Sequence, residues 1–301
     1  MKILISGGFG NQLFQYSFAH YLHAHGISNL ELLPDPSPRK DRPFRLGPLL
    51  GNCEHLELCE KGMSSSELFF RKVVFGATKF ALIRLFLMPI SKFITLAPSD
   101  PFAYINKIPK ARSRKMINGY FQNWQYVQQV HKTVSLEIAK SLEQVCFPDY
   151  VAQVVSQEKN LFVMHFRRGA DLQEVSQTMG VLDLKYYENI YDQFFQRNKR
   201  KDSVVVGISD DVTNFNQSSF NIKVDHVWGP DTLDDFQALK LMSIANVLVT
   251  ANSTFSWWGG VLAEKKGGIV YMPHPWFKNW HEPVGDAFKY PRFRVAQATF
   301  I

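Results

Sequence analysis

Residues 161–171 read Leu-Phe-Val-Met-His-Phe-Arg-Arg-Gly-Ala-Asp. The short apolar run, ending in a histidine and two arginines, predicts a buried parallel strand whose carboxyl end opens into a site. Ligands of open α/β sheets bind outside the carboxyl ends of the strands, so Arg167 and Arg168 are expected where a phosphate would lie. A guanidinium matches two phosphate oxygens at once, which favours an anionic ligand over an ion pair with Asp171 or another carboxylate. His165 either contacts this ligand or closes the strand.

Strands and helices alternate regularly beyond Pro148 and Asp149, which mark a candidate boundary. The pattern predicts strands at 161–166, 203–208, 224–228, 247–250 and 269–272, the last being the final strand, and helices at 184–197, 233–244 and 253–265. Repeated strand–helix units imply a parallel sheet with helices on both faces.

The first half of the chain begins with its own strand, glycine-rich turn and helix. The patterns predict strands at 2–6, 30–33 and 116–121, helices at 11–25 and 124–145, an irregular proline-rich loop at 34–48, and a long helical region to about residue 96. The predicted fold class is therefore α/β, with two Rossmann-like lobes, residues 1–150 and 151–301, and a cleft between them.

The N-terminal turn reads Gly7-Gly8-Phe9-Gly10-Asn11 between a predicted strand and helix. Glycines at Gly8 and Gly10 let the backbone approach a ligand, and a helix N-terminus attracts negative charge. The turn is not the dinucleotide fingerprint, because the third glycine is missing. The plainer interpretation is a tight turn with Asn11 as the N-cap.

Two further polar stretches follow predicted strands. Residues 252–256, which read Asn-Ser-Thr-Phe-Ser, are natural caps for the next helix and predict a second phosphate cradle there; simple capping is the alternative. Asp210 and Asp211 follow the predicted strand at 203–208. Carboxylates at this position either bind a base edge or a ribose, or stabilise the start of the next helix through its dipole.

The composition is that of a globular protein, with 46% hydrophobic and 20% charged residues. A formal net charge of +7 favours acidic partners, but the scattered basic residues and the lack of a groove-reading motif argue against nucleic acid. The three cysteines complete no zinc pattern with a second Cys or His pair, so we expect reduced thiols and no metal.

The segment 68–96 is basic and amphipathic, but its charges keep it from spanning a bilayer. A helix packed on its own domain with a solvated basic face is the commoner case and ranks ahead of contact with an anionic membrane. We therefore expect a cytoplasmic protein, with peripheral contact at the inner face of the membrane as the alternative.

Four motifs together resemble the bacterial α-1,2-fucosyltransferase family. They span most of the chain in the family's order, at 7–16 (GGFGNQLFQY), 119–122 (GYFQ), 165–169 (HFRRG) and 252–259 (NSTFSWWG). The resemblance implies a two-lobed GT-B fold and GDP-β-L-fucose as donor. It also implies transfer with inversion to the 2-hydroxyl of a galactose, and no metal requirement.

The resemblance also assigns roles to residues. Arg167 and Arg168 match the arginines that grip the donor diphosphate, and His165 heads their motif. The remaining donor-side candidates are Gly8, Gly10, Asp210, Asp211, Asn252, Ser253, Thr254, Phe255 and Ser256. Asn11 matches a position that faces the cleft from the acceptor lobe.

The general base is expected among Asp171, Glu174 and His165. The family reads His-x-Arg-Arg-Gly-Asp, whereas here Ala170 intervenes and the acid follows one position later, as Asp171. Three other functions stay open on the sequence: a transferase for another nucleotide sugar, a non-catalytic glycan-binding protein, and a nucleic-acid-binding protein. The acceptor glycan and the oligomeric state are not specified by any motif.

Overall fold

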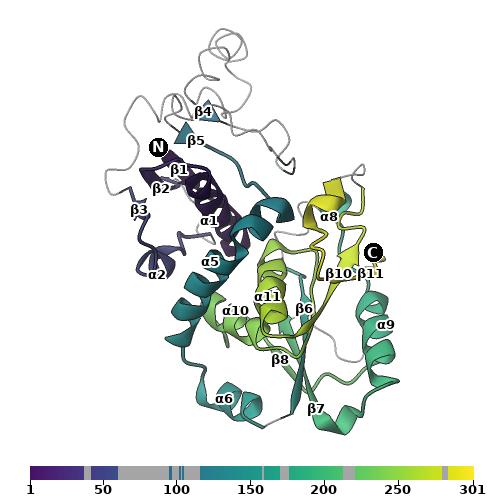
Figure 1. Cartoon of the computed structure of the whole chain (residues 1–301). Coiled ribbons are helices and arrows are strands. Elements are labelled where there is room, and N and C mark those ends of the chain that lie inside the picture. Colours follow the sequence, from purple (N-terminus) through teal and green to yellow (C-terminus); the bar gives the residue numbers. More distant parts are fainter. Residues whose placement is uncertain are drawn as a thin grey trace. The chain divides into compact units, whose positions relative to one another are not determined.

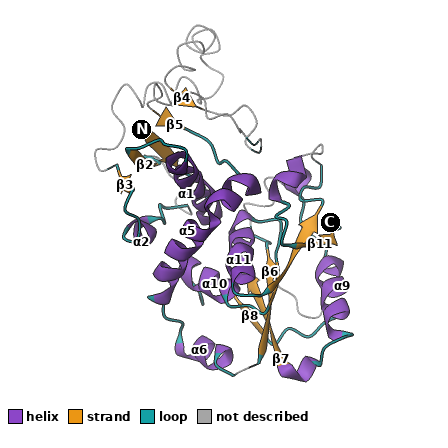
Figure 2. Cartoon of the chain, in the orientation of Figure 1, coloured by secondary structure: helices purple, strands orange, loops and turns teal. Residues whose placement is uncertain are grey.

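The computed structural model describes residues 1–36, 42–59, 95–96, 102, 104, 116–157, 159–169, 176–212, 221–279 and 284–301. The chain forms two compact units, Met1–Glu137 and Ile138–Ile301, and the division falls within helix α5 (Trp124–Glu143). Each unit is built on its own parallel sheet (Figures 1 and 2). The predicted α/β class with two Rossmann-like units is therefore confirmed, while the domain boundary at residue 150 stays a prediction.

The N-terminal sheet has the strand order β3-β2-β1-β5-β4, all parallel. Its strands are β1 (Lys2–Ile5), β2 (Leu30–Pro34), β3 (Leu56–Leu58), β4 (Thr95–Leu96) and β5 (Met116–Ile117). The order changes direction between β1 and β5, so the segments after these two strands flank the switch point of the sheet. The glycine-rich turn follows β1, and the Gly-Tyr-Phe-Gln motif follows β5.

Helix α1 (Phe9–Ala24) begins two residues before the predicted start at 11, and Gly8 is its N-cap, so the expectation of Asn11 as N-cap was wrong. The proline-rich stretch was also not wholly irregular. Pro34 ends β2, and Pro48 lies in the first turn of the short helix α2 (Gly47–Leu50), where its missing N–H costs nothing. Residues 60–94, which hold most of the basic amphipathic segment, lie outside the described residues.

The C-terminal sheet has the order β11-β10-β9-β6-β7-β8, again all parallel. Its strands are β6 (Asn160–Phe166), β7 (Ser203–Ser209), β8 (His226–Trp228), β9 (Val247–Val249), β10 (Ile269–His274) and β11 (Arg294–Gln297). In chain order this is the 3-2-1-4-5-6 arrangement of dinucleotide-binding folds, with its switch point between β6 and β9. The prediction that β10 is the last strand was wrong, because β11 pairs with its outer edge.

The C-terminal unit carries helices on both faces of its sheet (Figure 1). They are α6 (Asp149–Val155), α8 (Ser176–Met179), α9 (Leu184–Phe195), α10 (Asp235–Ser243) and α11 (Thr254–Lys265), with 3-10 turns η3 (Arg200–Asp202) and η5 (Val284–Phe288). Strand β6 is buried on both sides. Phe162, Met164 and Phe166 join one core cluster with the tyrosines of α9. The alternate residues, His165 among them, face the side of α11.

Candidate functional site

The arginine motif leaves β6 at the switch point of the C-terminal sheet, next to the end of β9. Arg167 Nη1 donates a hydrogen bond to the backbone carbonyl of Asn252, at 3.3 Å. The two residues are 85 positions apart in sequence and follow the two strands whose order reverses. The sequence predicts the arginines at a ligand-binding strand end, and this contact joins Arg167 to the second predicted cradle.

Asp210 holds the backbone of the arginine motif. One carboxylate oxygen of Asp210 accepts from the N–H of Arg168 at 2.5 Å and from the N–H of Gly169 at 2.9 Å. Hydrogen bonds to a carboxylate are charge-assisted and contribute roughly 1.5–3 kcal/mol each. Asp210 therefore fixes the turn that carries Arg168. The Ser209 hydroxyl donates to the backbone carbonyl of neighbouring Asp211 and accepts from its N–H.

Asn252 is almost fully buried at the end of β9. Its Nδ2 donates to the carbonyls of Met179 and Gly180, both at 3.0 Å, while Oδ1 has no partner among the described residues. The amide thus anchors the segment after α8 to the centre of the sheet.

Helix α11 starts beside this anchor, with Ser253 at the N-cap position. The predicted cap position is therefore confirmed, although the Ser253 side chain makes no capping hydrogen bond. Thr254 and Phe255 form the first turn, and Phe255 lies edge-on to His165 with ring centroids 6.1 Å apart. Ser256 is fully buried, and its hydroxyl points to the carbonyls of Ala251 and Ser253. The positive end of the α11 dipole therefore lies at the switch point.

His165 lies inside the C-terminal core. Burial, aided by the charge of Arg167, lowers the pKa of its imidazole to about 3. Nδ1 has no hydrogen-bond partner among the described residues, and the backbone carbonyl accepts from the Tyr187 hydroxyl at 2.9 Å. A neutral, enclosed imidazole is a weak base at neutral pH. Asp171 and Glu174, the other two candidates for the base, lie outside the described residues.

The N-terminal unit carries the second set of motif residues, at its own switch point. Gln122 Nε2 donates to Asn11 Oδ1 at 2.7 Å, which joins the motif after β5 to the first turn of α1. Gly7 has a φ of +80°, and a Cβ there would lie 2.9 Å from Asn11 Nδ2 and 3.0 Å from the Tyr120 ring. At Gly8 a Cβ would meet nothing within 4 Å.

Phe121 occupies an unusual backbone conformation in this motif. Its φ is +52°, a region that costs a non-glycine residue roughly 1–3 kcal/mol. The ring is buried and stacks on Phe18, with centroids 3.7 Å apart. Packing of the ring therefore holds a strained backbone that directs the next residue, Gln122, toward Asn11.

Sequence reasoning missed three glutamines that organise this end of the sheet. Gln15 accepts from the Ser6 N–H and donates to the Gly119 carbonyl, both at 3.0 Å, so it spans the switch point between β1 and β5. Gln12 donates to the Gly7 and Pro43 carbonyls and accepts from the Arg45 N–H. Gln122 is the third. The polarity of Gln12 and Gln15 within an otherwise apolar helical pattern was the available signal for those two, since a buried amide needs several partners.

A cavity of about 410 Å³ lies at the opposite end of the C-terminal sheet. Its lining includes Ser203 at the start of β7, with Arg200, Lys201, Lys223 and Asp225. Partial burial opposes ionisation of Asp225, but hydrogen bonds from the Val205 N–H at 2.9 Å and from Arg200 at 2.7 Å together lower the pKa of that carboxyl. Because ligands of such sheets bind at the carboxyl ends of the strands, we place the candidate site at the switch point and not in this cavity.

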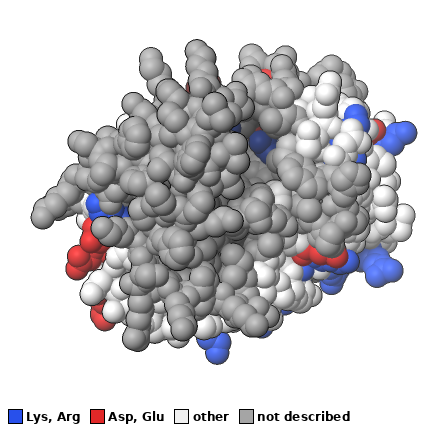
Figure 3. Space-filling model, turned by 90° about the horizontal axis from the view of Figure 1, so that it is seen from above, with Lys and Arg blue, Asp and Glu red and all other residues white. Residues whose placement is uncertain are grey.

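On the side shown in Figure 3, some of the described Lys and Arg side chains lie beside Asp and Glu side chains and others lie apart from them. Within the described ranges, every helix is too short or too polar to cross a bilayer.

Comparison with known proteins identifies the class to which this fold and these motifs belong. The sequence model of Glycosyl transferase family 11 matches residues 97–289, more than half of the chain. The chain therefore belongs to this family, the α-1,2-fucosyltransferase family, as the sequence motifs suggested.

Individual proteins are also similar to the chain over most of its length. The O-antigen biosynthesis glycosyltransferase WbnK of Escherichia coli is 25% identical over 92% of this chain and 95% of its own length. Among solved structures, NodZ alpha-1,6-fucosyltransferase soaked with GDP-fucose aligns with a TM-score of 0.50 at 12% identity, over 87% of this chain and 92% of that chain. Fucosyltransferase NodZ from Bradyrhizobium aligns with a TM-score of 0.49 at 12% identity, over 86% of this chain and 91% of that chain. At 12% identity the likeness to the GDP-fucose-soaked NodZ structure shows the fold alone, and the predicted GT-B-like class is confirmed.

Proposed function

We propose that this glycosyltransferase moves L-fucose from GDP-β-L-fucose to the 2-hydroxyl of a galactose in a glycan, with inversion at the anomeric carbon. Membership of family 11 supports fucosyl transfer. The observation that carries the donor assignment is the hydrogen bond from Arg167 to the Asn252 carbonyl, because it brings the arginine motif and the start of α11 to one switch point.

The donor half of the proposal rests on the C-terminal unit. Arg167 and Arg168 bind the diphosphate of GDP-fucose, and the first-turn N–H groups of α11, at Thr254 and Phe255, face the same charge. Asp210 keeps Arg168 in place through the backbone. Ser253, whose hydroxyl is not used as a cap, is available to a phosphate oxygen.

The chemical step needs charge stabilisation at the leaving group. The bond between fucose C1 and the phosphate oxygen breaks, and that oxygen keeps the electron pair as GDP departs. The acceptor O2 attacks C1 from the opposite face, and its proton passes to a general base. Two guanidinium groups and a helix N-terminus stabilise the developing diphosphate charge, so we propose that transfer needs no divalent metal.

The base is proposed among the acids that follow the arginines. Asp171 and Glu174 follow Arg168 within six residues in sequence. His165 was the third candidate, but its buried position and lowered pKa suit a residue that packs the strand end.

The N-terminal unit is proposed to bind the acceptor. Asn11, held by Gln122, presents a polar side chain at a switch point, and the open space at Gly8 suits close approach of a ligand to the backbone. The named relative takes part in O-antigen biosynthesis, so we propose a galactose-containing surface polysaccharide as the acceptor class. A cytoplasmic location with peripheral membrane contact fits a lipid-linked acceptor of this kind and is part of the proposal.

The test is product analysis with the full chain. The protein is incubated with GDP-fucose and a panel of β-galactosides, without added Mg²⁺ or Mn²⁺, and the linkage of the product is determined by NMR. We expect released GDP and a fucose α-linked to galactose O2. GDP-mannose and UDP-galactose serve as control donors. Turnover of a control donor but not of GDP-fucose would support a transferase for another nucleotide sugar. Glycan binding without GDP release would indicate a lectin. If the protein shows neither activity but binds DNA with an affinity that falls steeply with salt, it is a nucleic-acid-binding protein.

A further inference from the structure

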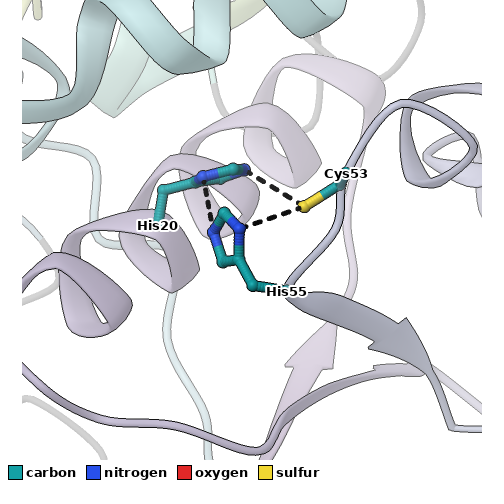
Figure 4. A group of neighbouring side chains, drawn as sticks. All are labelled: His20, Cys53 and His55. Atoms are coloured by element: carbon teal, nitrogen blue, oxygen red, sulfur yellow. Dashed lines mark hydrogen bonds between the residues drawn. The ribbon is translucent and has the colours of Figure 1, made fainter.

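A cluster of nitrogen and sulfur side chains lies in the N-terminal unit, away from the glycine-rich turn. It consists of His20 on α1 together with Cys53 and His55 from the segment before β3 (Figure 4). One ligand atom from each of the three side chains lies within 4.8 Å of the other two. We call these three residues the His20 cluster.

The distances inside the cluster suit a small cation. Cys53 Sγ lies 4.0 Å from His20 Nε2 and 3.9 Å from His55 Nδ1. The corresponding sulfur–nitrogen separation in a tetrahedral zinc site is about 3.5 Å, from Zn–S and Zn–N bonds of about 2.3 and 2.0–2.1 Å. A shift of a few tenths of an ångström would therefore bring both sulfur–nitrogen separations to zinc distance, while the two coordinating nitrogens start within 4.8 Å of each other.

A carboxylate on another helix contacts one member of the cluster, although it lies outside the three residues whose ligand atoms are all within 4.8 Å of one another. Glu137 of α5 places Oε2 2.9 Å from His20 Nε2, the nitrogen that also faces Cys53. Tyr16, one turn before His20 on α1, donates its hydroxyl to the same carboxylate oxygen at 2.7 Å. Carboxylates that coordinate a metal are commonly oriented by a hydrogen bond from a neighbouring residue.

Hydrogen bonds alone do not supply enough protons for all the nitrogen, sulfur and oxygen atoms that face one another in the cluster. His20 Nε2 carries at most one proton, yet it faces both the Cys53 sulfur and the Glu137 carboxylate. His20 Nδ1 faces His55 Nε2 at 3.1 Å, and His20 is almost fully buried. A cation at the centre would satisfy the imidazoles, the thiolate and the carboxylate together, which a single proton cannot do.

We propose that His20, Cys53 and His55, with Glu137 as the fourth ligand, bind Zn²⁺. Two imidazoles, one thiolate and one carboxylate are ligands that zinc accepts in tetrahedral sites. The ion links α1, the segment before β3 and α5 within the N-terminal unit. Its role is structural and separate from the metal-free transfer step proposed above, so the inference does not rest on the proposed function.

The experiment uses the full chain freed of metal and titrated with Co²⁺, a coloured substitute for Zn²⁺. We expect one equivalent to bind with the intense visible bands of a tetrahedral site and a thiolate-to-cobalt charge-transfer band, both abolished by equimolar Zn²⁺. The Zn²⁺ affinity is then measured by competition with a chromophoric chelator.

Variants assign the ligands. Cys53→Ser should remove the charge-transfer band, and His55→Asn should weaken Zn²⁺ binding by at least about 10-fold. Cys146→Ser and His131→Asn alter an exposed cysteine and a half-buried histidine outside the cluster, so both should bind Co²⁺ like the wild type. In the wild type, one equivalent of Zn²⁺ should also slow alkylation of Cys53 by iodoacetamide by at least about 10-fold. That measurement needs no variant to fold.

Three results would overturn the proposal. They are no uptake of Co²⁺ or Zn²⁺ at micromolar concentration, a cobalt spectrum without a thiolate band, and alkylation of Cys53 at the same rate with and without Zn²⁺. Any of them would leave the cluster as a thiol–imidazole hydrogen-bonded group.

Discussion

Arg167 and Asn252 join the two strands at which the C-terminal sheet reverses its order, through a hydrogen bond of 3.3 Å from the guanidinium to the backbone carbonyl. Neither residue is close to the other in sequence, and each belongs to a motif that sequence reasoning had singled out separately. The contact brings the two motifs together at the switch point of this sheet.

The carboxylate of Asp210 should matter for donor binding through the backbone. Asp210→Ala removes the acceptor of the Arg168 and Gly169 N–H groups, so we expect GDP to bind about 10-fold more weakly. Asp210→Asn keeps one acceptor oxygen and should lose less. Calorimetric titration with GDP measures both, and Asp231→Asn, on an exposed turn, is the control. Equal losses for Asp210→Ala and Asp231→Asn would contradict the positioning role.

Substitution by alanine should destabilise the protein at Gly7 but not at Gly8. Gly7→Ala forces a left-handed residue against Asn11 and Tyr120, so we expect a loss of roughly 1–3 kcal/mol in the free energy of unfolding. Gly8→Ala meets open space at a φ of −68° and should unfold like the wild type. Urea unfolding followed by circular dichroism compares the pair. Equal stability of the two variants would contradict the described turn.

Burial of His165 predicts a pH dependence of stability. Its pKa in the folded state is about 3, below the unfolded value of about 6.5, so the unfolded state binds more protons between these values. The contribution of the neutral imidazole is complete above about pH 6.5 and is lost as the pH falls toward 3. For one proton the slope reaches at most about 1.4 kcal/mol per pH unit.

The comparison for this prediction is His165→Gln, which should show a shallower fall in the free energy of unfolding between pH 6.5 and 5. His131→Gln changes a half-buried histidine on α5 and should keep the wild-type slope. In case His165→Gln does not fold, NMR of the wild type gives the same answer, because the His165 ring should not titrate between pH 7.5 and 5. A His165 resonance that titrates near pH 6.5 would refute the assignment.

Much of the fold followed from short-range patterns. The apolar runs before His165 and Asp210 are parallel strands, and the periodic residues from Trp124 to Glu143 form one helix. Apolar periodicity is local, so the sequence carries it directly. Strand β11 was missed because its burial is slight and its register depends on β10, more than 20 residues earlier. The predicted strand at 116–121 shortened to Met116–Ile117, since Phe121 turns into a left-handed conformation.

The candidate site was predictable in its parts but not in its assembly. The motifs around Arg167 and Asn252 were found separately, and only the strand order shows that they meet. The structural role of Asp210 could not be read from the sequence, because its partners are backbone groups 41 and 42 residues away. The His20 cluster could not be predicted for the same reason, because it depends on a contact between distant residues. Cys53 and His55 are two residues apart, but His20 lies 33 residues before Cys53 on another element.

The central claim is that two neighbouring arginines at this switch point bind the diphosphate of the donor. The most direct test is calorimetric titration of the wild type and of Arg168→Ala with GDP, with UDP as the control nucleotide. We expect the wild type to prefer GDP, and Arg168→Ala to remain folded while its Kd for GDP rises by roughly 10- to 100-fold, since a charge-assisted hydrogen bond contributes about 1.5–3 kcal/mol. A folded Arg168→Ala variant that binds GDP as tightly as the wild type would contradict the claim.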